Sequence, residues 1–289
     1  MSLPSNILLI GTGLIGGSII LKLKSKGFNG RVFGSDLSAA HLDQALEKGI
    51  IDETLTSKTL PAGIDLIILC VPVDAAITIL PDLLEKIEPS TVIMDVGSTK
   101  LDIVQSVKNH SNRGRFVAFH PMWGTENSGP EAAQEESFTS KAAVLCDIEN
   151  SDKDAVNKVE GLAKTLGMHL LYMSAEAHDV HTAYISHISH ITSYALANTV
   201  LEKEREEDTI FQLASSGFSS TVRLAKSHPE MWVPIFKQNK ENVLDVLNEH
   251  ISQLRKFKSA LEKENYDLLE ELIRNANKIR PILEEKREH

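Results

Sequence analysis

The chain has 289 residues, 42% of them hydrophobic, a length that allows one domain and favours two. Its formal net charge of −10 argues against nucleic acid and against an anionic membrane surface as main partners. No apolar run reaches the roughly 18 residues that a bilayer-spanning helix needs. Two cysteines indicate no disulfide framework, so we expect a cytoplasmic protein.

The most informative motif lies directly after the apolar run 6–10, which predicts a short buried strand. The three glycines that follow have the spacing G-x-G-x-x-G and lead into an apolar helix. In a dinucleotide site, the first glycine permits a tight turn, the second lets a pyrophosphate approach the backbone, and the third lets the helix pack closely on the sheet. The helix N-terminus adds free N–H groups for the phosphates. The predicted cofactor contacts here are Gly11, Gly13, Leu14, Ile15 and Gly16.

A carboxylate follows the second predicted strand, 31–35, at Asp36. In this place a carboxylate accepts hydrogen bonds from the ribose hydroxyls of an adenosine and repels a 2′-phosphate. The motif therefore predicts NAD rather than NADP. The alternative is a glycine-rich turn with an aspartate that follows it by chance.

Strand-like and helical patterns alternate in the first part of the chain and predict a doubly wound, mostly parallel sheet. The expected strands are 6–10, 31–35, 64–70, 91–96, 115–119, 142–147 and 168–173, and the expected helices are 14–26, 38–48, 74–87, 99–110 and 152–166. After Ser174 helical periodicity continues to the end of the chain. We therefore expect an α/β Rossmann-type NAD-binding domain at 1–174, an all-α helical domain for substrate binding and dimerisation at 175–289, and a ligand cleft between them.

Two predicted strand ends place reactive side chains at the carboxyl edge of the sheet, where α/β folds bind ligands. Ser98 follows the strand 91–96 and is placed either to cap the next helix or to contact a ligand. His120 follows the strand 115–119 and precedes a loop rich in Gly, Asn and Ser. Its ordinary pKa of about 6.5 suits a general base that takes a hydroxyl proton. A structural histidine that binds a loop carbonyl is the alternative.

Histidines and tyrosines recur three or four residues apart after Ser174 and predict one broad polar stripe along a helix. The six residues are His178, His181, Tyr184, His187, His190 and Tyr194. Their spacing is not H-E-x-x-H, and no cysteine or carboxylate cluster completes a ligand set, so we expect no metal. At least two of the four histidines are expected to be structural, and one or two to bind substrate.

Arg223 lies just beyond a predicted helix break at Gly217 and Phe218. In an acidic protein, a lone arginine near a cleft is a good bidentate partner for a carboxylate. A side chain that simply reaches solvent is the alternative from this segment alone.

Taken together, these segments resemble the prephenate and arogenate dehydrogenases of tyrosine biosynthesis. The match runs in order over nearly the whole length, and the succession of DVGSTK and HPMWGTE is specific to this family among Rossmann enzymes. The matching segments are GTGLIGGS at 11–18, Asp36, CVPV at 70–73, DVGSTK at 95–100, HPMWGTENSG at 120–129, SHISH at 186–190 and GFSSTVRLAKSHPEMW at 217–232.

The resemblance implies an NAD-linked oxidation at C4 of a cyclohexadiene ring, with loss of the ring carboxylate as CO2 and aromatisation. It implies that His120 takes the proton of the ring hydroxyl, that Ser98 holds the same hydroxyl, and that Arg223 binds a substrate carboxylate. The other implied contacts are His187 and His190 on the helix, Thr125 and Glu126 at the pocket mouth, and Val71 and Pro72 under the nicotinamide and its ribose.

Prephenate is the favoured substrate, arogenate is the alternative, and a homodimer is expected. Two other hypotheses are a dehydrogenase of the β-hydroxyacid type, which needs a lysine that 175–201 lacks, and a non-catalytic NAD-binding sensor. Many members of the family carry a basic residue and an aspartate where this chain has Ser219 and Ser220, so we expect no ionic gate between subunits. We expect no regulatory domain after the helical one and therefore expect any feedback by tyrosine at the active site.

Overall fold

A computed structural model of the chain describes residues 4–55, 59–207 and 209–285. The chain divides into two compact units, 1–239 and 240–289. This division lies far beyond residue 174, because the first helices after the sheet pack with the sheet in one unit. The domain boundary near 174 stays a prediction. None of the described helices is long and apolar enough to cross a membrane.

The described residues of the first unit form one eight-stranded sheet with the order β3-β2-β1-β4-β5-β6-β7-β8. Every neighbouring pair is parallel except β6 and β7. The first six positions follow the strand order of dinucleotide-binding folds. The strands are β1 (Asn6–Ile10), β2 (Arg31–Ser35), β3 (Glu53–Thr54), β4 (Leu66–Leu69), β5 (Val92–Asp95), β6 (Phe116–Pro121), β7 (Ala142–Cys146) and β8 (His169–Met173).

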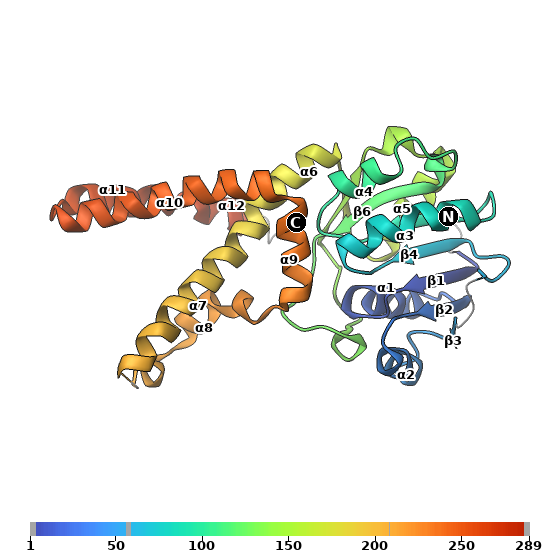
Figure 1. Cartoon of the computed structure of the whole chain (residues 1–289), viewed down its shortest axis with the longest axis horizontal. Helices are drawn as coiled ribbons and strands as arrows, with labels where there is room; N and C mark the ends of the chain where they lie inside the picture. The colour runs from blue at the N-terminus through green and yellow to red at the C-terminus, as the bar shows by residue number, and fades with distance from the viewer. Residues whose placement is uncertain (1–3, 56–58, 208, 286–289) are drawn as a thin grey trace. The chain divides into compact units, whose positions relative to one another are not determined.

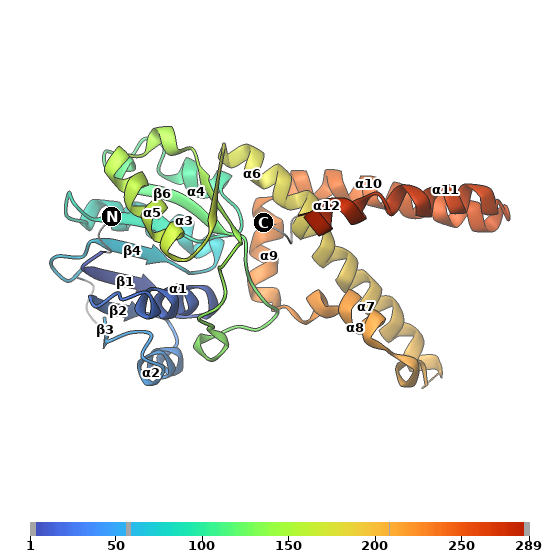
Figure 2. The same cartoon turned by 180° about the vertical axis from the view of Figure 1, so that it is seen from behind.

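The predicted α/β class is confirmed, and helices cover both faces of the sheet (Figure 1). Alternate side chains of β1 face opposite ways: Ile7 and Leu9 pack with α1, and Leu8 packs with α3. Figure 2 shows the sheet from behind. The helices on the face of α1 are α1 (Leu14–Ser25), α2 (Ala39–Glu47) and α5 (Lys153–Thr165), and those on the other face are α3 (Val73–Lys86) and α4 (Leu101–Ser106).

The sequence missed some local structure. The two-residue strand β3 is too short to leave an apolar run, and the helix expected at 99–110 is α-helical only from Leu101 to Ser106. Short 3-10 turns lie at Arg113–Arg115, Pro130–Ala132 and Ile148–Asn150.

Helices dominate the chain after β8, as expected. The first unit continues with α6 (Ala175–Thr182), a π-helical turn (Ala183–His187), α7 (Ile188–Glu207), a 3-10 turn (Ile210–Leu213), α8 (Ser216–Thr221), a second 3-10 turn (Arg223–Lys226) and α9 (Pro229–Gln238). Trp232 and Ile235 of α9 pack on Val73 at the start of α3, which fixes α9 beside the carboxyl ends of the strands. The second unit contains α10 (Lys240–Glu262), α11 (Tyr266–Ala276) and α12 (Ile279–Glu285).

The single polar stripe predicted from the histidine spacing is wrong. His181 and Tyr184 are exposed, whereas His178, His187 and His190 are buried. In a regular α-helix, nine residues make about two and a half turns, so His178 and His187 would lie on opposite faces. The π-helical turn between them is wider and rotates the following helix, which brings the buried histidines to the same side.

Candidate active site

A pocket of about 610 Å³ opens at the carboxyl ends of β1, β4, β5 and β6 and is closed on its other side by α7 and α9. Its volume is in the range of small-molecule and cofactor sites. Eleven of the fifteen residues predicted for the site line it: Gly13, Leu14, Ile15, Val71, Pro72, Ser98, His120, Thr125, His187, His190 and Arg223. The other four, Gly11, Gly16, Asp36 and Glu126, lie beside it in supporting positions described below.

The glycine loop has the shape that a pyrophosphate requires. Gly11 has φ of +87°, and a Cβ there would lie 2.4 Å from the Cys70 carbonyl oxygen, so the turn admits only glycine. A Cβ on Gly13 would meet no atom within 4 Å, which leaves the backbone open to a ligand. A Cβ on Gly16 would lie 2.9 Å from the Gly11 carbonyl oxygen and 2.6 Å from a Leu9 methyl, so α1 could not stay this close to the turn and the sheet. These three environments fit a dinucleotide.

Asp36 at the end of β2 is half-buried and bound to the glycine loop. Its Oδ2 accepts hydrogen bonds from the backbone N–H of Thr12 at 2.8 Å and from the Thr12 hydroxyl at 3.1 Å, and its Oδ1 accepts from the Ser38 N–H at 2.9 Å. A carboxylate has about four acceptor sites, so capacity remains for a ribose hydroxyl. Asp36 therefore stands where an NAD site needs an acceptor.

His120, near the end of β6, lines the pocket and contacts a second histidine behind it. Its Nδ1 lies 2.8 Å from Nε2 of His178, and Nδ1 of His178 lies 2.8 Å from Oδ1 of Asp179. Burial first, and then the Coulombic influence of His178, Lys100 and His187, hold the pKa of His120 well below its usual value. His120 is therefore neutral near pH 7 and can take a proton.

An ion pair lies buried beneath these histidines. Lys100 Nζ contacts Asp95 Oδ2 at 2.5 Å, and both side chains are at most 1% exposed. The carboxylate of Asp95 also accepts the backbone N–H of Gly97 at 2.8 Å and of Phe119 at 3.3 Å. The pair thereby ties the loop after β5 to β6, the two segments that carry Ser98 and His120. Removing either partner would leave an unpaired buried charge, which costs about 3–5 kcal/mol.

Of the two alternatives for Ser98, the structure does not support the helix cap. The first helical residue is Leu101, and Asp179 of α6 supplies the acceptors for that end of α4. Ser98 instead lines the pocket, as does Thr125, whose hydroxyl accepts the backbone N–H of Asn127 at 3.2 Å. The cap is a single residue, Asp179, which lies 79 positions after Lys100 and 78 after Leu101, a pairing that no local pattern could reveal.

His187 and His190 present different ring atoms to the pocket. Nδ1 of His187 lies 3.1 Å from the amide nitrogen of Asn239, so it accepts and its Nε2 carries the hydrogen. Nδ1 of His190 donates to the carbonyl of Ser186 at 3.0 Å, so its Nε2 is an acceptor. Burial lowers the pKa of His187 to about 4 and also lowers that of His190, and both rings are neutral near pH 7.

The mouth of the pocket carries cations. Arg223 Nη1 binds Glu126 Oε2 at 2.9 Å, with the two side chains 50% and 24% exposed. This bond joins the loop after β6 to the turn at Arg223–Lys226. Lys141, which the sequence analysis did not select, lines the same pocket. Carboxylates are absent from the described lining, although Glu126 adjoins it through Arg223.

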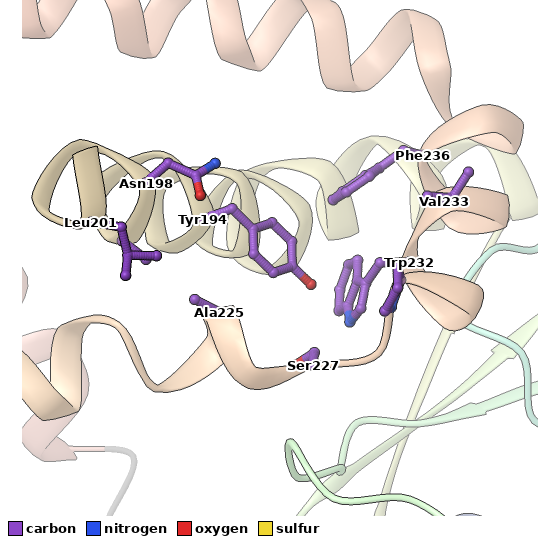
Figure 3. A pocket seen from close by; sticks show the side chains of 10 residues that line it. Tyr194, Asn198, Leu201, Ala225, Ser227, Trp232, Val233 and Phe236 are labelled. Carbon is purple, nitrogen blue, oxygen red and sulfur yellow. The ribbon is translucent and has the colours of Figure 1, made fainter. Parts of the chain in front are cut away.

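Trp232 separates this pocket from a second one of about 440 Å³ (Figure 3). The indole stacks on His190 with ring centroids 3.5 Å apart. Its Nε1 is buried and has no hydrogen-bond partner among the described residues. The second pocket lies between α7 and the segment 225–236, and the glycine loop contributes nothing to it. We therefore place the chemistry in the first pocket.

Sequence reasoning missed His178 as a partner of His120, and also Asp179, Lys141 and Asn239. The adjacent letters His-Asp in the histidine run were the available signal for the first two, because a carboxylate commonly orients an imidazole. Lys141 and Asn239 left no such signal, because each reaches the site only through the tertiary fold. Among the described residues, no group of three or more His, Cys, Asp or Glu could hold a metal ion.

Comparisons with known proteins agree along the whole chain. Residues 19–172 match the family model "Prephenate dehydrogenase, nucleotide-binding domain", and residues 174–275 match "Prephenate dehydrogenase, dimerization domain". The chain is 34% identical to the prephenate dehydrogenase of Bacillus subtilis strain 168 over 92% of this chain and 73% of that one.

Solved structures give the same result. The prephenate dehydrogenase of Aquifex aeolicus, crystallised with hydroxyphenyl propionate and NAD+, is 31% identical with a TM-score of 0.88, over 98% of this chain and 99% of that one. The arogenate dehydrogenase of Synechocystis is 25% identical with a TM-score of 0.75, over 96% and 99% of the two chains.

Proposed function

Because the chain belongs to the prephenate dehydrogenase family, we propose that it is an NAD-dependent enzyme that oxidises and decarboxylates prephenate to 4-hydroxyphenylpyruvate. One observation carries the proposal: a neutral, half-buried His120 lines the same pocket as the open backbone of Gly13. A base and a dinucleotide cradle on one cavity are what the oxidation of an alcohol needs.

The proposed chemistry starts at the ring hydroxyl on C4. Ser98 holds this hydroxyl, and Nε2 of His120 takes its proton as the hydride leaves C4 and the carbonyl forms. Bound NAD+ supplies the hydride acceptor. The C–C bond to the ring carboxylate then breaks, CO2 leaves, and the electron pair aromatises the ring. His120 returns its proton to the phenolate oxygen, so the reaction releases no net proton. Positioning and deprotonation are the enzyme's main tasks.

Cations of the pocket are proposed to hold the substrate carboxylates. Arg223 and Lys141 both line it, and described carboxylates do not. The unpartnered Nε1–H of Trp232 would also find an acceptor in a bound anion. His187, which carries hydrogen on Nε2, is a further donor. This charge balance favours prephenate, which has two carboxylates and no ammonium.

Arogenate is the second candidate, and Glu126 is the observation that favours it. Its carboxylate stands beside the pocket in an ion pair with Arg223, and it could bind the ammonium that arogenate adds. Two hydrogen-bond acceptors, Nε2 of His190 in the pocket and the carboxylate of Glu126 beside it, would then face the amino group.

An assay of NADH production tests the proposal. Prephenate and arogenate are each offered with NAD+ and with NADP+, and absorbance at the nicotinamide band is followed. We expect turnover with prephenate and NAD+ that exceeds every other combination. Binding of NADH without turnover of either substrate would contradict the proposal and support a non-catalytic NAD-binding sensor.

We also propose a homodimer in the cytoplasm. The dimerization-domain model covers 174–275, and α10 and α11 expose apolar side chains suited to helix packing, among them Leu254, Leu261 and Ile273. Solution scattering should give twice the mass of 31.9 kDa, and a monomeric mass would contradict the proposal. An ionic gate through Ser219 and Ser220 is not part of the proposal, because neither side chain carries a charge.

A further inference from the structure

We infer that His178 and Asp179 are a positioning pair that fixes which ring nitrogen of His120 faces the pocket. The inference rests on the proposed function, in which Nε2 of His120 takes the hydroxyl proton. It concerns residues behind the pocket wall, because neither His178 nor Asp179 lines the pocket.

Asp179 is the fixed end of the hydrogen-bonded series Asp179–His178–His120. Its Oδ1 accepts the backbone N–H of Lys100 at 2.8 Å, and its Oδ2 accepts the N–H of Leu101 at 2.9 Å. Both donors belong to the rigid start of α4, and the carboxylate is buried. Two short bonds from the backbone leave it little freedom to turn.

His178 takes its orientation from this carboxylate. An ionised carboxylate only accepts hydrogen bonds, so Nδ1 of His178, 2.8 Å from Oδ1, must carry hydrogen. The ring is 1% exposed, and burial lowers its pKa, although Asp179 opposes this shift. A neutral ring with hydrogen on Nδ1 has its lone pair on Nε2. The reverse arrangement would set two acceptors against each other in a buried place, which costs free energy.

His120 completes the sequence of bonds. Nε2 of His178 is an acceptor, so Nδ1 of His120, 2.8 Å away, donates to it. A neutral His120 therefore has its lone pair on Nε2, the atom that the proposed reaction uses. When Nε2 takes the proton, Nδ1–H of His120 stays bonded to His178. The new positive charge on His120 is then separated from the carboxylate of Asp179 only by the His178 ring. The arrangement follows the logic of the serine protease triad with a second imidazole inserted.

Several charged groups surround the pair and affect the stability of a positive charge on His120. Lys100, Asp95 and Asp179 face His178, and Lys100 and His187 face His120. Lys100 is already paired with Asp95, which reduces its repulsion of an imidazolium. The carboxylate of Asp179 remains as the acceptor aligned with the two rings.

Two substitutions at His178 separate positioning from packing. His178→Gln can place an amide oxygen near the former Nε2 and still accept from His120, whereas His178→Leu cannot. We expect His178→Leu to lower kcat about 10²-fold or more, with KM for prephenate and Kd for NAD+ within about twofold. The kcat of His178→Gln should be at least about tenfold higher than that of His178→Leu. Equal kcat in both variants and the wild type would overturn the inference.

His181→Leu is the matched control, because His181 lies on the same helix and is exposed. It should keep the wild-type kcat and melting temperature. A loss of kcat in His181→Leu equal to that in His178→Leu would overturn the inference, because the loss would then come from the helix rather than from the pair.

Asp179→Asn tests the direction of the bonds. An amide NH2 facing His178 would make Nδ1 the acceptor, reverse both imidazoles and put hydrogen on Nε2 of His120. The same exchange in the serine protease triad lowers kcat by about 10⁴ through the wrong tautomer. We expect a larger loss of kcat than in His178→Gln. A smaller loss would overturn the inference.

The tautomer itself can be observed without turnover. Protein labelled with ¹⁵N-histidine gives ring-nitrogen shifts, and the signals of His120 are identified by their loss in His120→Asn. We expect a protonated Nδ1 and a bare Nε2 in the wild type, and a mixture in His178→Leu. Hydrogen on Nε2 in the wild type would overturn the inference even if prephenate is turned over. The expected spectrum without turnover supports the pair and contradicts only the proposed function.

Discussion

The charged groups behind the inner wall of the pocket, the side that carries His120, are buried, whereas those at its mouth are exposed to solvent. Behind the wall, Lys100, Asp95 and Asp179 are almost fully buried, and each has a partner within 3 Å. At the mouth, Arg223 and Glu126 form one ion pair that solvent reaches from both sides. Buried groups cannot exchange partners without a large cost, whereas an exposed pair is worth only about 0–1 kcal/mol.

This difference suits two different tasks. The wall must present one protonation state and one tautomer at every turnover, so its groups are fixed. In the proposed function, Arg223 at the mouth would release Glu126 when a substrate carboxylate arrives, so a weak bond between the two would be an advantage. Substitutions that reach the wall should therefore change kcat, and those at the mouth should change KM.

The largest effect is expected at the wall. His120→Asn removes the base and should lower kcat by roughly 10²–10⁴, while Kd for NAD+ stays within about twofold, because the glycine loop is untouched. Steady-state kinetics with prephenate and titration of NADH fluorescence measure the two quantities. Unchanged kcat would remove His120 from the chemistry.

The second prediction concerns the free energy of unfolding, which acidification should lower through the buried His187. Burial lowers its pKa to about 4 in the folded protein, against about 6.5 in an unfolded chain. Between these values only the unfolded chain binds the proton, so the free energy of unfolding falls as pH falls. From pH 7.5 to pH 5, His187 alone should account for about 2 kcal/mol.

Urea unfolding at the two pH values, followed by tryptophan fluorescence, measures this loss. His187→Gln cannot titrate and should lose about 2 kcal/mol less than the wild type on acidification. Equal losses in the two proteins would mean that His187 is protonated in the folded state or that it titrates normally there.

The burial of Asp36 is intermediate between that of the inner-wall groups and that of the ion pair at the mouth. Asp36→Ser removes the charge that would repel a 2′-phosphate, and like charges brought together cost several kcal/mol. We expect kcat/KM for NADP+ relative to NAD+ to rise at least about tenfold. If the unsubstituted protein already prefers NADP+, the prediction of NAD from Asp36 is wrong.

The smallest effects are expected at the mouth. Arg223→Ala should raise KM for prephenate about fivefold, because an ion pair at a half-exposed site contributes roughly 1 kcal/mol to binding. KM for NAD+ should change little. Glu126→Gln is its partner variant and should lower KM for prephenate by about twofold, because Arg223 loses its competitor. Equal changes for prephenate and NAD+ in Arg223→Ala would indicate altered folding instead.

The sheet could be predicted because its signals are local. Buried parallel strands leave solid apolar runs such as 6–10 and 66–69, and the glycine spacing marks the turn after β1. The strand-end positions of Asp36, Ser98 and His120 followed from that. Arg223 and the helix histidines were also singled out from their own segments, the family resemblance implied their roles, and all three of Arg223, His187 and His190 line the same pocket.

The inner wall could not be predicted in the same way. Asp179 caps a helix that begins 78 residues earlier, and its value to His120 depends on a second ring between them. The histidine stripe failed because a periodicity argument assumes a regular helix, and the turn at Ala183–His187 is not regular. The error came from the geometry of one turn rather than from the choice of residues.

That turn makes the site depend on how one helix winds as well as on residue type. If the five residues Ala183–His187 were all kept but wound as an ordinary α-helix, each would add about 100° of rotation instead of the smaller angle of a π-turn, and all that follows would face another way. His187 and His190 would then leave the cavity together, although every side chain of the cavity survived. Any redesign that straightens this helix for stability would remove the binding face along with the irregularity.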